Sequence, residues 1–245
     1  MVVEERADWT FAVRLARDTL PALVTRPLQW GTRSWAAFVV FVLAATLMFL
    51  EKRSIQAVIA VHAHHNGWDV AAASANTLGS GWTMLAVGAG GIVIGRASSQ
   101  RLLRAAIVFA VAGLWGWSLL ILGQLVLAEA RPFEGGAMRF FALHGHGVSG
   151  HACAAALLFA PVCEGLRGIG RVPRSLVTAA LFVWVVFIAW SRVRLNMHYA
   201  WNVLVGAAIG AYVSRVTVDC ARGTRYARCD SNTRHSASKA DALSS

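Results

Sequence analysis

The chain has 245 residues, of which 57% are hydrophobic and only 14% are charged, and its formal net charge is +11. Soluble domains carry about 25% charged residues, so this composition excludes an ordinary soluble protein and indicates a membrane protein. The positive charge does not indicate nucleic acid, because the arginines lie between apolar runs and form no patterned basic face. We therefore expect no nucleic-acid partner.

Six apolar runs are long enough, or nearly long enough, to cross a bilayer as helices. They are residues 34–50, 76–95, 105–127, 150–166, 175–190 and 199–216. Lipid offers no hydrogen-bond partners, so each span must satisfy its own backbone groups. The sequence thus predicts an all-α, polytopic bundle of six transmembrane helices. The pairs Gly91/Gly95 and Gly206/Gly210 fit close helix crossings as well as they fit the general frequency of glycine in membrane helices.

The segments outside these runs divide by charge. If the N-terminus is cytoplasmic, the inner segments hold 17 of the 23 lysines and arginines; these segments are 1–33, 96–104, 167–174 and 215–245. This bias predicts an inner-membrane protein with both termini in the cytoplasm. We expect residues 1–33 to form a cytoplasmic segment with an interfacial helix, 34–216 the membrane domain, and 217–245 a basic, disordered tail.

Three polar clusters interrupt the apolar runs, all on the side opposite the termini. The first contains Gln124 and Arg131-Pro132, the second Ser149-Gly150-His151, and the third Ser191-Arg192, His198 and Asn202. Any one cluster would suit a simple anchor at the membrane surface. Ionisable groups from three separate segments that reach one depth are a functional signal.

These residue types suit phosphoryl transfer without a metal or cofactor. Arg131 and Arg192 can clamp phosphoryl oxygens through forked, charge-assisted hydrogen bonds. The backbone N–H groups where a helix begins, at Ser149 and Gly150, favour an anion. One histidine can attack phosphorus while another protonates the leaving alcohol.

The spacing of the clusters adds a second argument. Asn202 lies four residues after His198 on a helix face, so its side chain can orient that imidazole. The clusters read Gln124-x6-Arg131-Pro132, Val148-Ser149-Gly150-His151 and Ser191-Arg192-x5-His198-x3-Asn202. In order and spacing they resemble the motifs of the type 2 phosphatidic acid phosphatase (PAP2) family, which are Lys-x6-Arg-Pro, Pro-Ser-Gly-His and Ser-Arg-x5-His-x3-Asp. The resemblance covers roughly residues 34–216.

The resemblance implies roles for the matching residues. His198 would be the nucleophile that forms a phosphohistidine, and His151 the general acid. Arg131, Arg192, Ser149 and Gly150 would hold the phosphate. Membrane members of the family act on lipid phosphates or isoprenyl diphosphates, so we expect a lipid phosphatase or phosphotransferase whose site faces the periplasm. Neither the acceptor of the phosphoryl group nor the oligomeric state follows from the sequence.

Three positions depart from the family pattern. Val148 replaces proline without removing a charge. Gln124 replaces lysine and removes a positive charge from the phosphate site. Asn202 replaces aspartate, and an amide cannot stabilise an imidazolium as a carboxylate does.

Other residues and other protein classes compete with this interpretation. Glu129 and Glu134 are candidate substitute carboxylates, although we favour ordinary interfacial charges. His144 and His146 could line the site, but a solvated loop is favoured. The departures support an alternative function as a PAP2-fold binding or structural membrane protein with little catalysis. A transporter and a vanadate-dependent peroxidase rank lower, because no helix centre carries a charge and the phosphate-site lysine is missing.

Overall fold

The protein is almost entirely helical. The computed structural model describes residues 7–29, 31–59, 67–134, 138–140, 146–166 and 171–243. In chain order the elements are α1 (Trp9–Thr25), η1 (Arg26–Gln29), α2 (Thr32–Leu50), α3 (Lys52–Ile59), α4 (Gly67–Leu78), α5 (Gly81–Ser98), α6 (Gln100–Val126), β1 (Leu127–Glu129), η2 (Pro132–Glu134), β2 (Met138–Phe140), α7 (Gly150–Leu157), α8 (Phe159–Gly165), α9 (Arg171–Arg194) and α10 (Ala200–Leu243). The only strands in this described part form a short antiparallel pair in which Ala128 faces Arg139.

The apolar helices are those of a multi-pass membrane protein. Among the described residues, four helices are long and apolar enough to cross a bilayer: α2, α6, the Ser175–Arg194 part of α9 and the Ala200–Gly223 part of α10. Helices α4 and α5 together can form a fifth span that is bent by 50°. The sixth predicted run is the shorter apolar stretch Gly150–Gly165, made of α7 and α8. The all-α membrane class is confirmed, whereas the count of six spans is not.

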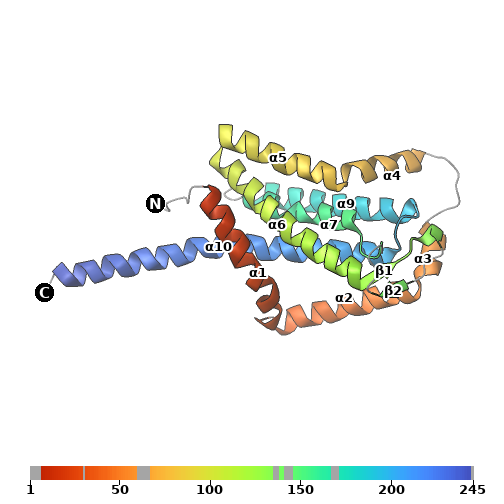
Figure 1. Cartoon of the computed structure of the whole chain (residues 1–245), viewed down its shortest axis with the longest axis horizontal. Helices are drawn as coiled ribbons and strands as arrows, with labels where there is room; N and C mark the ends of the chain where they lie inside the picture. The colour runs from red at the N-terminus through yellow and green to blue at the C-terminus, as the bar shows by residue number, and fades with distance from the viewer. Residues whose placement is uncertain are drawn as a thin grey trace.

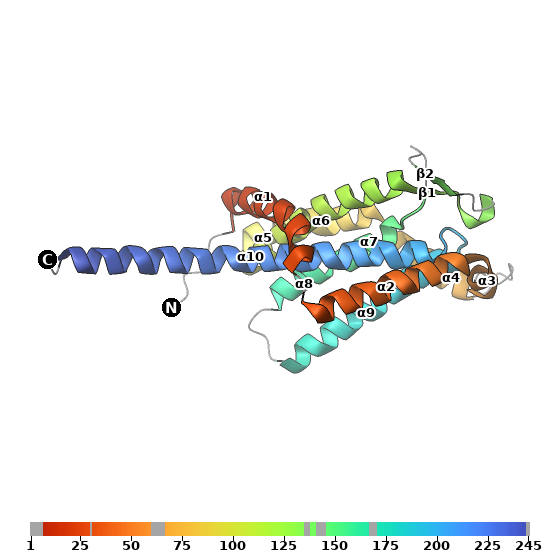
Figure 2. The ribbon, with the colours of Figure 1, turned by 90° about the horizontal axis from the view of Figure 1, so that it is seen from below.

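Segments assigned to one side of the membrane by their charge lie at one end of the molecule. Figure 1 shows α1, the junction of α5 with α6, and the far part of α10 toward one end, and α3 and the β1–β2 pair at the other. The view from below shows the same separation (Figure 2). Helix α10 continues through residues 217–243. The sequence predicts a disordered tail there, and that disorder stays a prediction.

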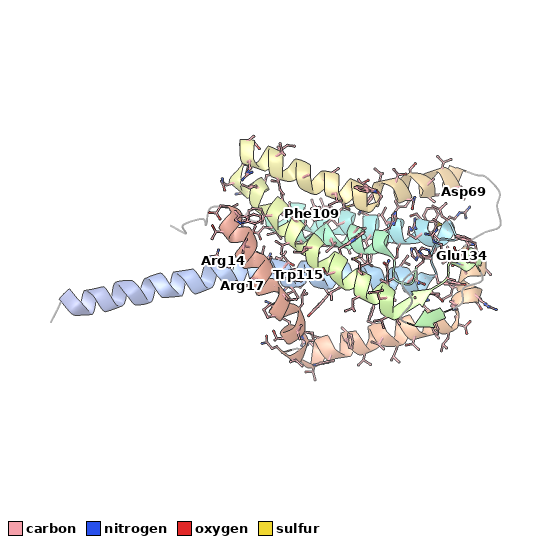
Figure 3. The ribbon with its side chains drawn as sticks, viewed as in Figure 1. Arg14, Arg17, Asp69, Phe109, Trp115 and Glu134 are labelled. Carbon is pink, nitrogen blue, oxygen red and sulfur yellow. The ribbon has the colours of Figure 1, made fainter. Side chains whose placement is uncertain are left out.

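The main core joins α1 to the central helices. Phe11 of α1, Val108 of α6, Cys153 of α7 and Val213 of α10 are fully buried in one apolar cluster. Helix α1 buries every fourth residue on this face and runs on through Pro21 to Thr25. Figure 3 shows Trp115 of α6 beside α1, where the indole N–H donates to the Ala16 carbonyl at 3.1 Å.

Close helix approach at two glycines brings α10 against the start of α7. A Cβ at Gly206 would lie 2.3 Å from the Ser149 carbonyl oxygen, and one at Gly210 would lie 2.3 Å from the Cys153 carbonyl oxygen. Any larger residue would push the helices apart, so these glycines place α10 directly beside the second motif. The Gly91/Gly95 pair also lies at a crossing, since a Cβ at Gly95 would meet the Leu103 backbone nitrogen at 2.5 Å.

Candidate active site

The three predicted clusters come together at one end of the bundle. Arg131 follows β1, Ser149 precedes α7, Arg192 lies near the end of α9, and His198 lies in the turn before α10. Figure 3 shows Glu134, three residues after Arg131, at this end of the molecule. The fold therefore gathers residues that lie far apart in the sequence.

A tight turn between α9 and α10 places His198 beside Arg192. The carbonyl oxygen of Arg192 accepts from the backbone N–H groups of Met197 at 3.0 Å and His198 at 3.2 Å. Asn196 adopts the left-handed conformation, with φ of 56°. The Gln56 side chain of α3 donates to the Asn196 side-chain oxygen at 2.6 Å and holds this turn. The five-residue spacing between the arginine and the histidine is thus the length of one closed turn.

Backbone contacts join the second motif to the third. Ser149 caps the N-terminus of α7, where its hydroxyl oxygen accepts from the Ala152 N–H at 3.5 Å. The Ser149 N–H donates to the carbonyl of Asn202 at 3.1 Å. The Ser149 N–H that we expected to bind an anion is therefore committed to α10. The Gly150 N–H and the Ser149 hydroxyl hydrogen are the groups of this motif that suit an anion.

His198 is buried among positive charges. Its side chain is only 8% exposed. Burial, with the charges of Arg192, His151, Arg131 and His146, lowers the pKa of His198 to about 3. The imidazole is therefore neutral at physiological pH, and its lone pair is available for attack on phosphorus.

Two arginines present buried donors without acceptors. The Nε atoms of Arg131 and Arg192 are both buried and have no hydrogen-bond partner among the residues that the structure describes. The Nη1 of Arg131 donates to the Met197 sulfur at 3.8 Å. The guanidinium carbon of Arg131 lies over the Phe133 ring, 5.8 Å from its centre. Two guanidinium groups beside a neutral imidazole suit a tetrahedral anion.

Gln124 and Asn202, the two amides that depart from the family motifs, each donate to a backbone carbonyl. The Gln124 Nε2 donates to the Val148 carbonyl at 2.9 Å, and the Asn202 Nδ2 donates to the adjacent Gly147 carbonyl. Among the described residues, the side-chain hydrogen bond of Asn202 goes to Gly147, and none joins it to His198. Within the described part of the chain, its buried Oδ1 has no hydrogen-bond partner. The predicted support of His198 by Asn202 thus stays a prediction.

The two candidate substitute carboxylates are engaged elsewhere. Glu129 is 1% exposed and pairs with Lys52 at 2.5 Å, while its other oxygen accepts from the Trp201 indole at 3.0 Å. Glu134 accepts from the Arg131 backbone N–H at 3.1 Å. Glu129 is therefore a buried ion-pair partner and not an interfacial charge. Within the described residues, no three His, Cys, Asp or Glu side chains are grouped as a metal site requires.

Two residues near the site were either not favoured or not identified from the sequence. His146, which we assigned to a solvated loop, lies close enough to His198 for its charge to act there. Asn76 of α4 accepts from the Nη1 of Arg192 through its side-chain oxygen. The only sequence signal for Asn76 was a single amide in an alanine-rich segment, residues 71–78. His144 lies outside the described residues.

Comparison with known proteins supports the family resemblance. Residues 129–225, which contain the arginine, histidine and serine motifs, match the PAP2 superfamily. The resemblance to the PAP2 family is confirmed. No curated protein matches the chain.

Two solved structures resemble this protein. The Bacillus subtilis transmembrane PAP2-type phosphatidylglycerolphosphate phosphatase is 17% identical, with a TM-score of 0.52, over 77% of this chain and 94% of that chain. LpxE from Aquifex aeolicus is 18% identical, with a TM-score of 0.48, over 69% of this chain and 94% of that chain. The Bacillus structure shows a shared fold, and the match to the PAP2 superfamily supports a phosphatase role.

Proposed function

We propose that this PAP2 protein transfers phosphoryl groups from lipid phosphates or isoprenyl diphosphates through a phosphohistidine at His198. The observation that carries the proposal is the pair of buried Nε donors on Arg131 and Arg192, which lack acceptors beside a neutral histidine. A bound phosphoryl group would supply oxygens to both donors and offset the clustered positive charge.

The reaction follows from the placement of the two histidines. A ring nitrogen of His198 attacks phosphorus and forms a P–N bond as the bond between phosphorus and the leaving oxygen breaks. His151 enters this step as the imidazolium, which the negative charge of a bound phosphoryl group favours, and gives the proton of its free ring nitrogen to that oxygen. Water then attacks the phosphohistidine, His151 accepts the proton from water, and inorganic phosphate leaves with His198 restored. A second lipid could replace water as the acceptor.

The substrate class and the orientation rest on chemistry and charge. A lipid substrate fits a site at the end of an apolar bundle, because its tails can remain among the helices while its phosphate meets the arginines. The positive-inside bias favours cytoplasmic termini and hence a site at the periplasmic face of the inner membrane.

A specific observation also favours a second candidate function. Asn202 and Gln124 donate to backbone carbonyls instead of supplying a carboxylate to His198 or a cation to the phosphate. This arrangement suits a PAP2-fold protein that binds lipid phosphates with little turnover. The two functions share the anion site and differ in whether His198 becomes phosphorylated.

Phosphate release by the purified protein in detergent separates these functions. Phosphatidic acid, phosphatidylglycerol phosphate and undecaprenyl diphosphate would be tested, with acid-labile phosphohistidine measured on the same samples. We expect release that His198→Gln and Arg192→Gln abolish. Arg194→Gln is the matched control, because Arg194 lies on the same helix end but pairs with Asp69 at 3.0 Å. Phosphate binding without release by the native protein would favour the second function, and neither binding nor release would refute both.

A further inference from the structure

Asn76 lies where the α4–α5 span is broken. Helix α4 ends at Leu78, α5 begins at Gly81, and the two are bent by 50°. In an unbroken helix the Ser80 N–H would donate to the carbonyl of Asn76 four residues earlier. Here the Ser80 N–H donates to the Thr77 carbonyl at 3.2 Å. The break therefore removes the usual intrahelical partner of the Asn76 carbonyl.

This residue contacts two members of the candidate site through different groups. Its side-chain Oδ1 accepts from Nη1 of Arg192. Its backbone lies beside the imidazole of His151, within reach of a hydrogen bond. The Asn76 N–H belongs to the body of α4, so the freed carbonyl is the group that accepts from the imidazole. One residue thus touches both the phosphate clamp and the candidate acid.

We propose that Asn76 is a positioning residue, which fixes Arg192 and His151 relative to each other so that both address one phosphoryl group. This inference rests on the proposed phosphoryl-transfer function. The Oδ1 contact occupies Nη1 of Arg192 and directs the unpartnered Nε toward the anion. The carbonyl contact occupies one ring nitrogen of His151 and leaves the other for the leaving oxygen.

The chemistry of the side chain suits this task. A carboxylate at position 76 would also orient the guanidinium, but its charge would compete with the phosphate for Arg192. A neutral amide accepts the same hydrogen bond and leaves the positive charge available. Close packing fixes the position of the broken segment, since a Cβ at Gly79 would lie 3.0 Å from the Ile188 side chain of α9.

The test measures the affinity for inorganic phosphate, from the phosphate-dependent rise in the melting temperature of the full chain in detergent. Asn76→Ala removes the acceptor of Arg192, and we expect roughly tenfold weaker binding, the size of one hydrogen bond to a charged group. Asn76→Asp should also weaken phosphate binding, because the new carboxylate would pair with the Arg192 guanidinium and compete with the phosphate. Ser74→Ala on the same helix is the matched control, as its hydroxyl bonds only the Val70 carbonyl at 2.9 Å.

A double-mutant cycle distinguishes positioning from general stabilisation. Combined with Arg192→Gln, Asn76→Ala should produce no further loss of phosphate affinity, because its partner is already absent. Should the single variant fail to fold, Asn76→Ser supplies the same cycle with a shorter polar side chain. Native binding that Asn76→Ala leaves unchanged, or losses that simply add, would overturn the inference while the proposed function stands. If the native protein binds neither phosphate nor lipid phosphate, the proposed function fails and this inference fails with it.

Discussion

Restoring the family aspartate at position 202 is the sharpest test of this site. The sequence alone suggests that Asn202→Asp should improve catalysis by supporting His198. The structure argues otherwise, because the Asn202 amide donates to the carbonyl of Gly147 and a carboxylate cannot donate. Gly147 is itself buried, so that carbonyl would have no water to replace the lost donor.

The expected loss follows from these contacts. A buried acceptor left without its donor costs about 1–3 kcal/mol. The cations near His198 can offset the desolvation of the new carboxylate, but they do not replace the missing N–H. For a chain of this length, that loss corresponds to a melting temperature about 2–12 °C lower. We also expect weaker phosphate binding, because Gly147 precedes Ser149 and Gly150, which we propose as phosphate contacts.

The assay compares Asn202→Asp with Asn202→Ala in thermal unfolding and in inorganic-phosphate binding. Both variants lose the donor to Gly147, while only the first adds a carboxylate. If the donor dominates, both should lose stability by similar amounts and neither should gain activity. An aspartate variant that melts like the native protein and releases phosphate faster would refute the reasoning and return Asn202 to the role of a weakened family carboxylate.

Three further predictions follow from the same contacts. Gln124→Leu should lower the unfolding free energy by about 1–3 kcal/mol, because the Val148 carbonyl loses its donor. Gln124→Lys keeps a donor and should bind phosphate at least as tightly as the native protein in the same titration. Because the pKa of His198 falls from 6.5 to about 3 on folding, the unfolded chain binds an extra proton between these values. The melting temperature should therefore fall as pH decreases from about 6.5 toward 3, and His198→Gln should flatten that slope. Lys52→Met should lower the unfolding free energy by about 3–5 kcal/mol, because it leaves the buried Glu129 carboxylate without its cation. Adding Glu129→Gln should recover part of the loss. A Lys52→Met variant as stable as the native protein would contradict the structural role of this pair.

Much of the fold could be read from the sequence, because lipid imposes a local rule. A segment without water must satisfy its own backbone, so long apolar runs predict helices directly. Residues 105–127 and 34–50 correspond closely to α6 and α2. The 76–95 run was harder to place, because the span begins earlier, at Gly67, and breaks before Gly81. Polar and small residues there obscure the hydropathy signal.

The sequence by itself determined the helical class, the family resemblance and the set of residues available for chemistry. Motif order and spacing carry that information, because the number of residues between Arg192 and His198 equals the closed turn that joins them. Only the tertiary structure decided the partners of those residues. It assigned Asn202 to Gly147 and brought Asn76 to Arg192 from more than a hundred residues away. Hydrogen-bond partners depend on how helices pack in three dimensions, and no local pattern in the chain records which carbonyl an amide will meet.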